Sequence, residues 1–296
     1  MYTRTHYITL LSNAIVTLAV VFTSVAAVQA VVPTHTYVSR YGDDNASGSM
    51  LSPCATFQAA YNKTAFGGTI SVLDAGEYGP VVIGHAITID GTLGQQGTIT
   101  NASTYAVTIT AGNFDAIILR HLAFITAAPS DDGIDFASGG SLIIDDCRFS
   151  GYQQDAIYDN GASMIVNDTK IVNGNNGIGI AILSGPVSLH NISITKATLA
   201  IYTNGGVTDV SDSVLTRSGQ GVDCVLGTVS LENCMISSNN TGLYSATGSI
   251  MRLSNCDIFN NITGLSNSGG TISSAGNNKK AGNGTPGVPN GSVTVQ

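Results

Sequence analysis

A repeating arrangement of apolar and polar positions runs from Leu142 to Leu265. An Asn or Asp, which we call the marker, recurs at steps of 21 to 23 residues: Asp146, Asp168, Asn191, Asp212, Asn233 and Asn255. An apolar residue stands two positions before each marker: Ile144, Val166, Leu189, Val210, Leu231 and Leu253. Another stands three positions after it: Phe149, Ile171, Ile194, Leu215, Ile236 and Ile258. A fixed period with several apolar positions is the sequence signature of a solenoid.

A third apolar position follows about ten residues after each marker: Ala156 or Ile157, Ile178, Ile201, Val222, Leu243 and Leu265. These runs are too short for helices, and alternation such as Val229 to Leu231 has the period of two that predicts strands. Every second residue faces inward up to the marker, and after the marker the alternation is shifted by one position. This shift predicts a bend in the chain at the marker. We therefore expect three short strands per coil of about 22 residues, with equivalent strands stacked about 4.8 Å apart. The predicted fold is all-β, a parallel β-helix.

The markers are expected to form a polar ladder at one corner, each amide bonding the next and satisfying buried polar groups. This assignment makes Asn191 inaccessible. The position after the marker faces inward, and in three coils it is a Cys: Cys147, Cys234 and Cys256. Buried Cys behaves as a small apolar side chain, and we favour that reading. Cys234 and Cys256 lie on adjacent coils, close enough for a disulfide in principle, although five Cys cannot form a complete disulfide framework.

The two ends of the chain differ from the repeat. Residues 1–30 are predicted to be a signal peptide, with Arg4 before the apolar run Ile8 to Val21, so we expect a secreted protein, extracellular or periplasmic. An uncleaved membrane anchor is the alternative. Residues 31–61 form an arm and a short helix, Pro53 to Tyr61, that caps the solenoid. The β-helix follows over 62–275, and 276–296 form a final turn and tail.

Composition narrows the choice of partners. The chain of 296 residues is 43% hydrophobic and 10% charged, with 35 Gly and no Trp, as suits a solenoid with many tight turns. Its net charge of −8 disfavours nucleic acid and repels polyanions unless a cation or a local Arg/Lys patch intervenes. We expect a monomer with no nucleic-acid partner and no membrane contact after signal cleavage.

Several short motifs carry a resemblance. They are Tyr37-Val38-Ser39, Ser52-Pro53-Cys54-Ala55-Thr56-Phe57, Gly67-Gly68-Thr69-Ile70, Ile87-Thr88-Ile89-Asp90-Gly91, Leu119-Arg120-His121-Leu122 and the Asn-Cys coils. With these the chain resembles the secreted right-handed parallel β-helix proteins of the pectin-lyase-like superfamily. The resemblance implies right-handed coiling and work on polysaccharides, by lyases and hydrolases among others. The Gly-His-Gly and Arg-Ile-Lys signatures of its polygalacturonase-like hydrolases are not found here.

Acidic residues crowd into two coils: Asp131, Asp132, Asp135, Asp145, Asp146, Asp155 and Asp159. Glycoside hydrolysis needs one protonated and one ionised carboxyl, and crowding separates their pKa values. The candidate catalytic residues are Asp131, Asp132, Asp135 and Asp145. The same acids could instead hold Ca²⁺, which prefers oxygen ligands, or could form a solvated acidic loop. We expect no resident cofactor and assign no metal ligands, with Ca²⁺ left open.

A second candidate site is a row of residues that follow the third apolar position: Tyr158, Gly179, Tyr202, Asp223, Tyr244 and Ser266. Outward Tyr rings could stack on sugar rings while their hydroxyls bond to sugar hydroxyls. Tyr on an exposed sheet is also ordinary β-structure decoration. Arg148 and Lys170 occupy equivalent outward positions beside Asp145 and could form a small basic spot. The candidate substrate-binding residues are Tyr158, Tyr202, Asp223, Tyr244, Arg148 and Lys170.

Our leading hypothesis is a secreted β-helix protein that binds extracellular or cell-surface polysaccharide along an outward sheet face. One alternative is a polysaccharide hydrolase or lyase that uses the aspartates. The other is a structural or adhesive solenoid without enzymatic activity.

Overall fold

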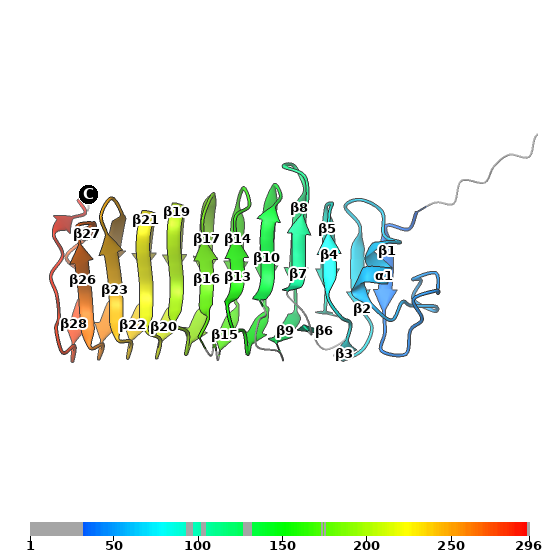
Figure 1. Cartoon of the computed structure of the whole chain (residues 1–296), viewed down its shortest axis with the longest axis horizontal. Helices are drawn as coiled ribbons and strands as arrows, with labels where there is room; N and C mark the ends of the chain where they lie inside the picture. Colours follow the sequence, from blue (N-terminus) through cyan, green and yellow to red (C-terminus); the bar gives the residue numbers. More distant parts are fainter. Residues whose placement is uncertain are drawn as a thin grey trace, which may run out of the picture. The chain divides into compact units, whose positions relative to one another are not determined.

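The computed structural model describes residues 32–92, 97–101, 105–126, 132–172, 174 and 176–294. Within the compact unit Val32–Gln296, successive coils stack side by side as a parallel β-helix (Figure 1). Every named strand pairing is parallel, and the strands form one 19-stranded and one 10-stranded sheet. The prediction of an all-β right-handed solenoid with three strands per coil is confirmed.

The first coils are less regular than those that follow. Their elements are β1 (His35–Val38), α1 (Phe57–Tyr61), β2 (Thr69–Val72), β3 (Gly76–Glu77), β4 (Val81–Ile83), β5 (Ile87–Asp90), β6 (Gly97–Asn101), β7 (Tyr105–Thr110), β8 (Ala116–Arg120) and β9 (Leu122–Thr126). The helix α1 begins after Thr56, whose side chain accepts a 3.1 Å hydrogen bond from the Ala59 N–H. It buries Phe57, Ala60 and Tyr61, the three residues expected to share a face.

The regular coils build three rows of strands. Row 1 contains β10 (Asp132–Ser138), β13 (Asp155–Asp159), β16 (Ile178–Ile182), the first part of β19 (Leu199–Ser211), the first part of β21 (Gln220–Glu232), β23 (Thr241–Ala246) and β26 (Thr263–Ser268). Row 2 contains β11 (Ser141–Asp145), β14 (Met164–Asn167), β17 (Pro186–His190), the second parts of β19 and β21, β24 (Ile250–Ser254), β27 (Thr271–Ser274) and β29 (Gly291–Ser292). Rows 1 and 2 belong to the 19-stranded sheet.

Row 3 is the separate 10-stranded sheet, which also contains β3, β6 and β9. Its regular strands are β12 (Arg148–Ser150), β15 (Lys170–Val172), β18 (Ser193–Thr195), β20 (Val214–Thr216), β22 (Met235–Ser237), β25 (Asp257–Phe259) and β28 (Lys279–Ala281). Figure 1 draws these strands along the lower edge of the molecule. Most of them carry outward side chains at their first and third positions, while Val172 at the third position of β15 is buried.

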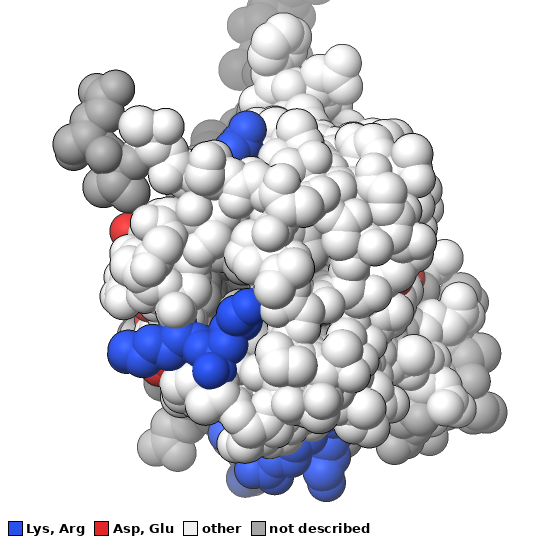
Figure 2. Space-filling model, turned by 90° about the vertical axis from the view of Figure 1, so that its left-hand side faces the viewer, with Lys and Arg blue, Asp and Glu red and all other residues white. Residues whose placement is uncertain are grey.

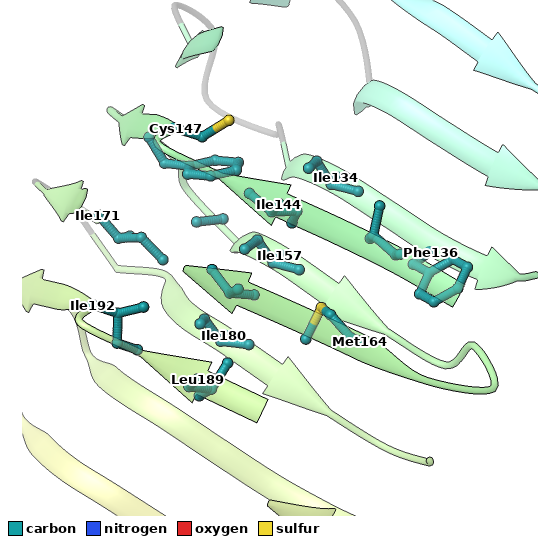
Figure 3. Close-up of a cluster of buried hydrophobic side chains, with 14 of the residues drawn as sticks. Ile134, Phe136, Ile144, Cys147, Ile157, Met164, Ile171, Ile180, Leu189 and Ile192 are labelled. Carbon is teal, nitrogen blue, oxygen red and sulfur yellow. The ribbon is translucent and has the colours of Figure 1, made fainter. Parts of the chain in front are cut away.

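The core consists of like residues stacked from coil to coil (Figure 3). Ile134, Ile157 and Ile180 lie in register on row 1, and all three are fully buried. On row 3 the Phe124 and Phe149 rings stack with centroids 4.4 Å apart. Continuous burial of this kind supplies the main stabilisation of the solenoid, because a single coil cannot enclose its own apolar face.

Each marker adopts a left-handed backbone conformation, with φ between 45° at Asp146 and 54° at Asn233. Asn and Asp tolerate this conformation better than most residues, which explains the repeat and confirms the predicted bend. Amides also bond along the corner, as Asn255 Nδ2 donates to Asn233 Oδ1 at 2.7 Å. The expectation that this ladder is buried is wrong, because Asn191 and the other markers at this corner are solvent exposed or half-buried.

A second ladder, which the sequence analysis missed, is the buried one. Asn239 and Asn261 are each 2% exposed at a corner that follows row 3. Asn239 Oδ1 accepts from the Ser218 N–H at 2.9 Å, and its Nδ2 donates to the Leu215 carbonyl and to Asn261 Oδ1, each at 3.1 Å. Asn261 repeats the pattern toward Asn283. Here the amides do satisfy buried backbone groups.

All five cysteines are buried thiols, as the reading of Cys as a small core residue predicts. Cys234 and Cys256 carry no disulfide; Cys234 Sγ donates to the Glu232 carbonyl at 3.2 Å and Cys256 Sγ to the Ser254 carbonyl at 3.3 Å. The predicted signal peptide lies outside the described residues. No helix in the described part of the chain has the length and apolar character needed to cross a bilayer.

Candidate functional site

A column of outward side chains crosses row 1, one residue per coil. It consists, in register, of Asp135, Tyr158, Ala181, Tyr202, Asp223, Tyr244 and Ser266, and we call it the tyrosine column. From Asp135 to Tyr244, the residues on either side of each member point inward and are buried, for example Ile201 and Thr203 around Tyr202. Three tyrosines therefore stand on one face, two coils apart, at a spacing of about 10 Å.

The structure corrects one member of the expected row. Ala181, not Gly179, lies between Tyr158 and Tyr202, because Ile180 rather than Ile178 is the third apolar position of that coil. The loop between β15 and β16 has five residues, whereas the loop between β18 and β19 has three. The two extra residues displace the register. The small Ala181 side chain is only 2% exposed between the two tyrosines.

Asp223 lies between Tyr202 and Tyr244 in the column, yet it is only 8% exposed. Its Oδ1 is buried without a hydrogen-bond partner in the described structure. Burial raises the pKa of this carboxyl, because the charged form loses hydration that no donor replaces. Gln220 begins the same strand, and its Oε1 is likewise buried and unpartnered. Unpaired buried acceptors are uncommon in folded proteins, and each requires an explanation such as a catalytic role or a bound water or ion.

Asp135 joins the same column at its other end, next to Tyr158. Burial also raises its pKa. The structure thus brings one candidate catalytic aspartate onto the face with the candidate binding residues, which the sequence analysis treated as separate. Asp135 and Asp223 are four coils apart, about 19 Å at the usual strand spacing. The carboxyl pair of a glycoside hydrolase is closer, at most about 9.5 Å apart.

The other candidate aspartates are dispersed. Asp145 ends β11 on row 2, and Asp146 is an exposed corner residue. Asp132 begins β10, while Asp131 lies outside the described residues. No group of three or more His, Cys, Asp or Glu side chains suited to a metal ion occurs within the described ranges.

Asp159 follows Tyr158 but points inward. It is fully buried, with Phe136 and Ile182 as its register neighbours. Its Oδ1 accepts a 3.1 Å hydrogen bond from the Gly161 N–H, and its Oδ2 has no partner in the described structure. Burial raises the pKa of this carboxyl to about 7. It cannot reach a ligand on the outer face of row 1.

Arg148 and Lys170 are register neighbours on row 3 and are exposed, so they lie on a different sheet from the tyrosine column. With Lys196 and Arg217 they line a depression of about 380 Å³. The sequence analysis missed Lys196 and Arg217. Both directly follow the last residue of a row 3 strand. Both also stand the same number of positions after a marker, so counting from the markers could have identified them as equivalent.

Comparisons with known proteins agree with this architecture. Residues 98–283 match the family model described as the right handed beta helix region, so the chain belongs to that family. A solved structure named rhamnogalacturonan lyase is similar in fold, with a TM-score of 0.60 and 11% identity over 76% of this chain and 75% of that chain. The predicted right-handed parallel β-helix is confirmed, and the solved structure shares this fold. No curated protein matches the chain.

Proposed function

We propose that this chain is a secreted β-helix protein that binds an extracellular or cell-surface polysaccharide along the tyrosine column. The observation that carries the proposal is the unpartnered Asp223 carboxyl oxygen between Tyr202 and Tyr244. A sugar ring offers an apolar face to an aromatic ring and hydroxyl donors to a carboxyl or amide oxygen. The column presents both kinds of group on one rigid sheet.

The spacing of the column suits an extended glycan. Tyr158, Tyr202 and Tyr244 recur about every 10 Å, roughly the length of two linked pyranose rings. A chain that runs parallel to the solenoid axis would place every second sugar on a tyrosine. The sugars between them would then lie over Ala181 and Asp223. The solved rhamnogalacturonan lyase of similar fold supports a carbohydrate ligand only as an analogy of fold.

A carbohydrate lyase or hydrolase is the second candidate, favoured by the raised pKa of Asp223. A carboxyl that stays protonated at higher pH is suited to general acid catalysis. Binding is the stronger proposal because Asp135, the other acid of the column, is about 19 Å away. The non-enzymatic structural or adhesive solenoid requires neither the tyrosines nor the unpaired oxygen.

A glycan panel with the purified protein, with and without Ca²⁺, tests the proposal. Retention and the release of reducing ends or unsaturated products are both measured. We expect retention without turnover, and about 3- to 10-fold weaker binding for Tyr202→Ala or Tyr244→Ala, in line with one lost aromatic contact each. Tyr41→Ala is the matched control, because Tyr41 is 78% exposed and lies outside row 1.

Two outcomes contradict the proposal. Turnover that depends on Asp223 would make the chain an enzyme. Equal retention by the Tyr202→Ala, Tyr244→Ala and Tyr41→Ala variants would remove the tyrosine column as the binding face.

A further inference from the structure

Four basic side chains from four consecutive coils surround the depression on row 3. Arg148 and Lys170 project from the first positions of β12 and β15, and Lys196 and Arg217 from the corners that follow β18 and β20. All four are exposed. The remaining described lining residues are Val172, Ser193 and Thr195, so no acidic side chain is among the described residues that line the depression. Seen from the C-terminal end, Lys and Arg side chains gather in groups, one of them at the lower edge, where Figure 1 draws row 3 (Figure 2).

These four cations have no ion pair or side-chain hydrogen bond in the part of the chain that the structure describes. Most other described cations do have partners: Arg120 with Asp90, Lys279 with Asp257, Lys63 with the Asp44 carbonyl, Arg40 with Tyr41, and Lys280 with the Gly287 carbonyl. Arg252 is the remaining exception. In a chain with net charge −8, the four unpaired cations therefore make a concentrated positive patch.

The backbone at two of the four positions is unfavourable for the residues found there. Lys196 and Arg217 have φ values of 60° and 54°, in the left-handed region. Later coils place Ser238, Asn260 and Gly282 at the same corner, and of these Asn and Gly adopt this conformation at less cost. Residues that keep a disfavoured conformation often serve a function. The corner needs no cation for its geometry, so the charge at these positions requires a different explanation.

We infer that this row 3 patch binds a linear acidic polysaccharide, one that carries carboxylate or sulfate groups along its length. One cation per coil at about 4.8 Å spans about 14 Å along the solenoid, and Lys196 and Arg217 stand three residues beyond the strand position of Arg148 and Lys170, about 10 Å across the row. The four cations therefore form a diagonal array, which fits a polymer with repeated charges that crosses the row obliquely. Guanidinium groups bond such anions at two points, and the Ser193 and Thr195 hydroxyls lie among the cations to bond sugar hydroxyls. A single-stranded nucleic acid would lack a stacking platform, because no aromatic ring lines the depression.

This second site is independent of the tyrosine column, because it lies on another sheet and uses charge rather than aromatic stacking. The two sites can therefore fail separately. Variants of the patch leave Tyr202 and Tyr244 untouched, and variants of the tyrosine column leave the four cations untouched.

The test is titration of the full chain with dextran sulfate and polygalacturonate, with neutral dextran as the reference polymer. Lys196→Asn with Arg217→Asn removes two charges and gives the corner a residue that it already has at Asn260, so this variant should fold. We expect at least tenfold weaker binding of the acidic polymers and a smaller dependence on salt concentration. Arg252→Gln with Lys280→Gln changes the net charge equally and should alter binding less than twofold.

Three outcomes would overturn the inference. The first is an equal loss of binding in both double variants, which would show a response to net charge alone. The second is binding of an oligothymidylate as tight as that of the acidic polysaccharides. The third is displacement of the polymer by inorganic sulfate at low millimolar concentration, which would indicate a site for a small anion.

Discussion

The backbone N–H of Gly161 donates a 3.1 Å hydrogen bond to Oδ1 of Asp159, a fully buried carboxyl whose other oxygen is unpartnered in the described structure. Its pKa is about 7 in the folded protein, against an unfolded value of about 3.9. The folded state therefore holds the proton more tightly. The resulting stabilisation is complete below about pH 4 and is lost as the pH rises through about 7, a change of roughly 4 kcal/mol at most.

Asp159→Asn should remove this pH dependence. The amide oxygen can still accept from Gly161, and no charge is buried. We expect the variant to gain up to about 4 kcal/mol in free energy of unfolding at pH 8 relative to the parent chain, and to gain little at pH 4. Urea unfolding at both pH values measures the difference. Asp146→Asn, at an exposed marker, is the control; a variant of Asp159 that behaves like it would show that the buried carboxyl is not the titrating group.

Asp223 offers a distinction between binding and catalysis. Asp223→Asn keeps an oxygen acceptor between Tyr202 and Tyr244, so we expect glycan binding to remain within about threefold of the parent. Asp223→Leu removes the acceptor, and binding should weaken about tenfold, the cost of one unsatisfied hydrogen bond. Isothermal titration against a glycan retained in the panel measures both. Equal affinities for the parent and the Leu variant would exclude Asp223 from the site.

The two ladders should differ strongly in their contribution to stability. Asn239→Ala leaves the Leu215 carbonyl, the Ser218 N–H and Asn261 Oδ1 without their amide partner in a buried corner, so we expect a loss of about 3 to 5 kcal/mol. Asn239→Ser should lose less, because Ser218 occupies the same place in the preceding coil and bonds the Ala197 N–H there.

Asn233→Gly is the matched change in the exposed ladder. Gly adopts the φ of 54° without strain, and the lost amide bonds are exposed to water, so the free energy of unfolding should fall by less than about 1 kcal/mol. Thermal and urea unfolding compare the three variants. A loss at Asn233 as large as that at Asn239 would contradict the assignment of the buried ladder.

The cysteines should be free and unreactive in the folded protein. Burial raises the pKa of Cys147 to about 12, and a hydrogen bond with the Cys256 thiol, together with burial, raises the pKa of Cys234, so almost no thiolate forms at these two residues at pH 8. The same pairing lowers the pKa of Cys256, but this side chain is fully buried and inaccessible to a reagent. We expect iodoacetamide to leave the native chain unmodified and to label five thiols after unfolding without reductant. Mass spectrometry counts the labels. Three labels, with Cys234 and Cys256 protected until reduction, would instead indicate a disulfide between them.

The fold could be predicted because the repeat is local and regular. Ile144, Asp146 and Phe149 recur as a unit in six coils, and their apolar positions alternate with the period of strands. Strands of such short length bury their apolar faces only by stacking, so a parallel β-helix follows. The left-handed φ of Asp146 and its equivalents explains why Asn and Asp occupy the marker.

The candidate sites were less predictable. The tyrosine column depends on register, and two additional loop residues before Ile178 moved Ala181 into the place expected for Gly179. Loop length is visible in the sequence, but the distribution of its residues between loop and strand is settled by packing. The crowding of aspartates in the sequence did not predict a shared site, because the fold separates these residues. Asp135 lies on the outer face of row 1, Asp145 lies on row 2, and Asp159 lies in the core.

The sequence by itself determined the solenoid, its period, its corners and the outward tyrosines, because these follow from local alternation and backbone preference. Only the tertiary structure decided which polar groups share an environment. Asn191 is exposed and Asn239 is buried, although both are ladder amides, and Arg148 and Arg217 line one depression although they lie three coils apart. Burial and the meeting of distant side chains depend on how successive coils stack, and a single coil carries no record of its neighbours.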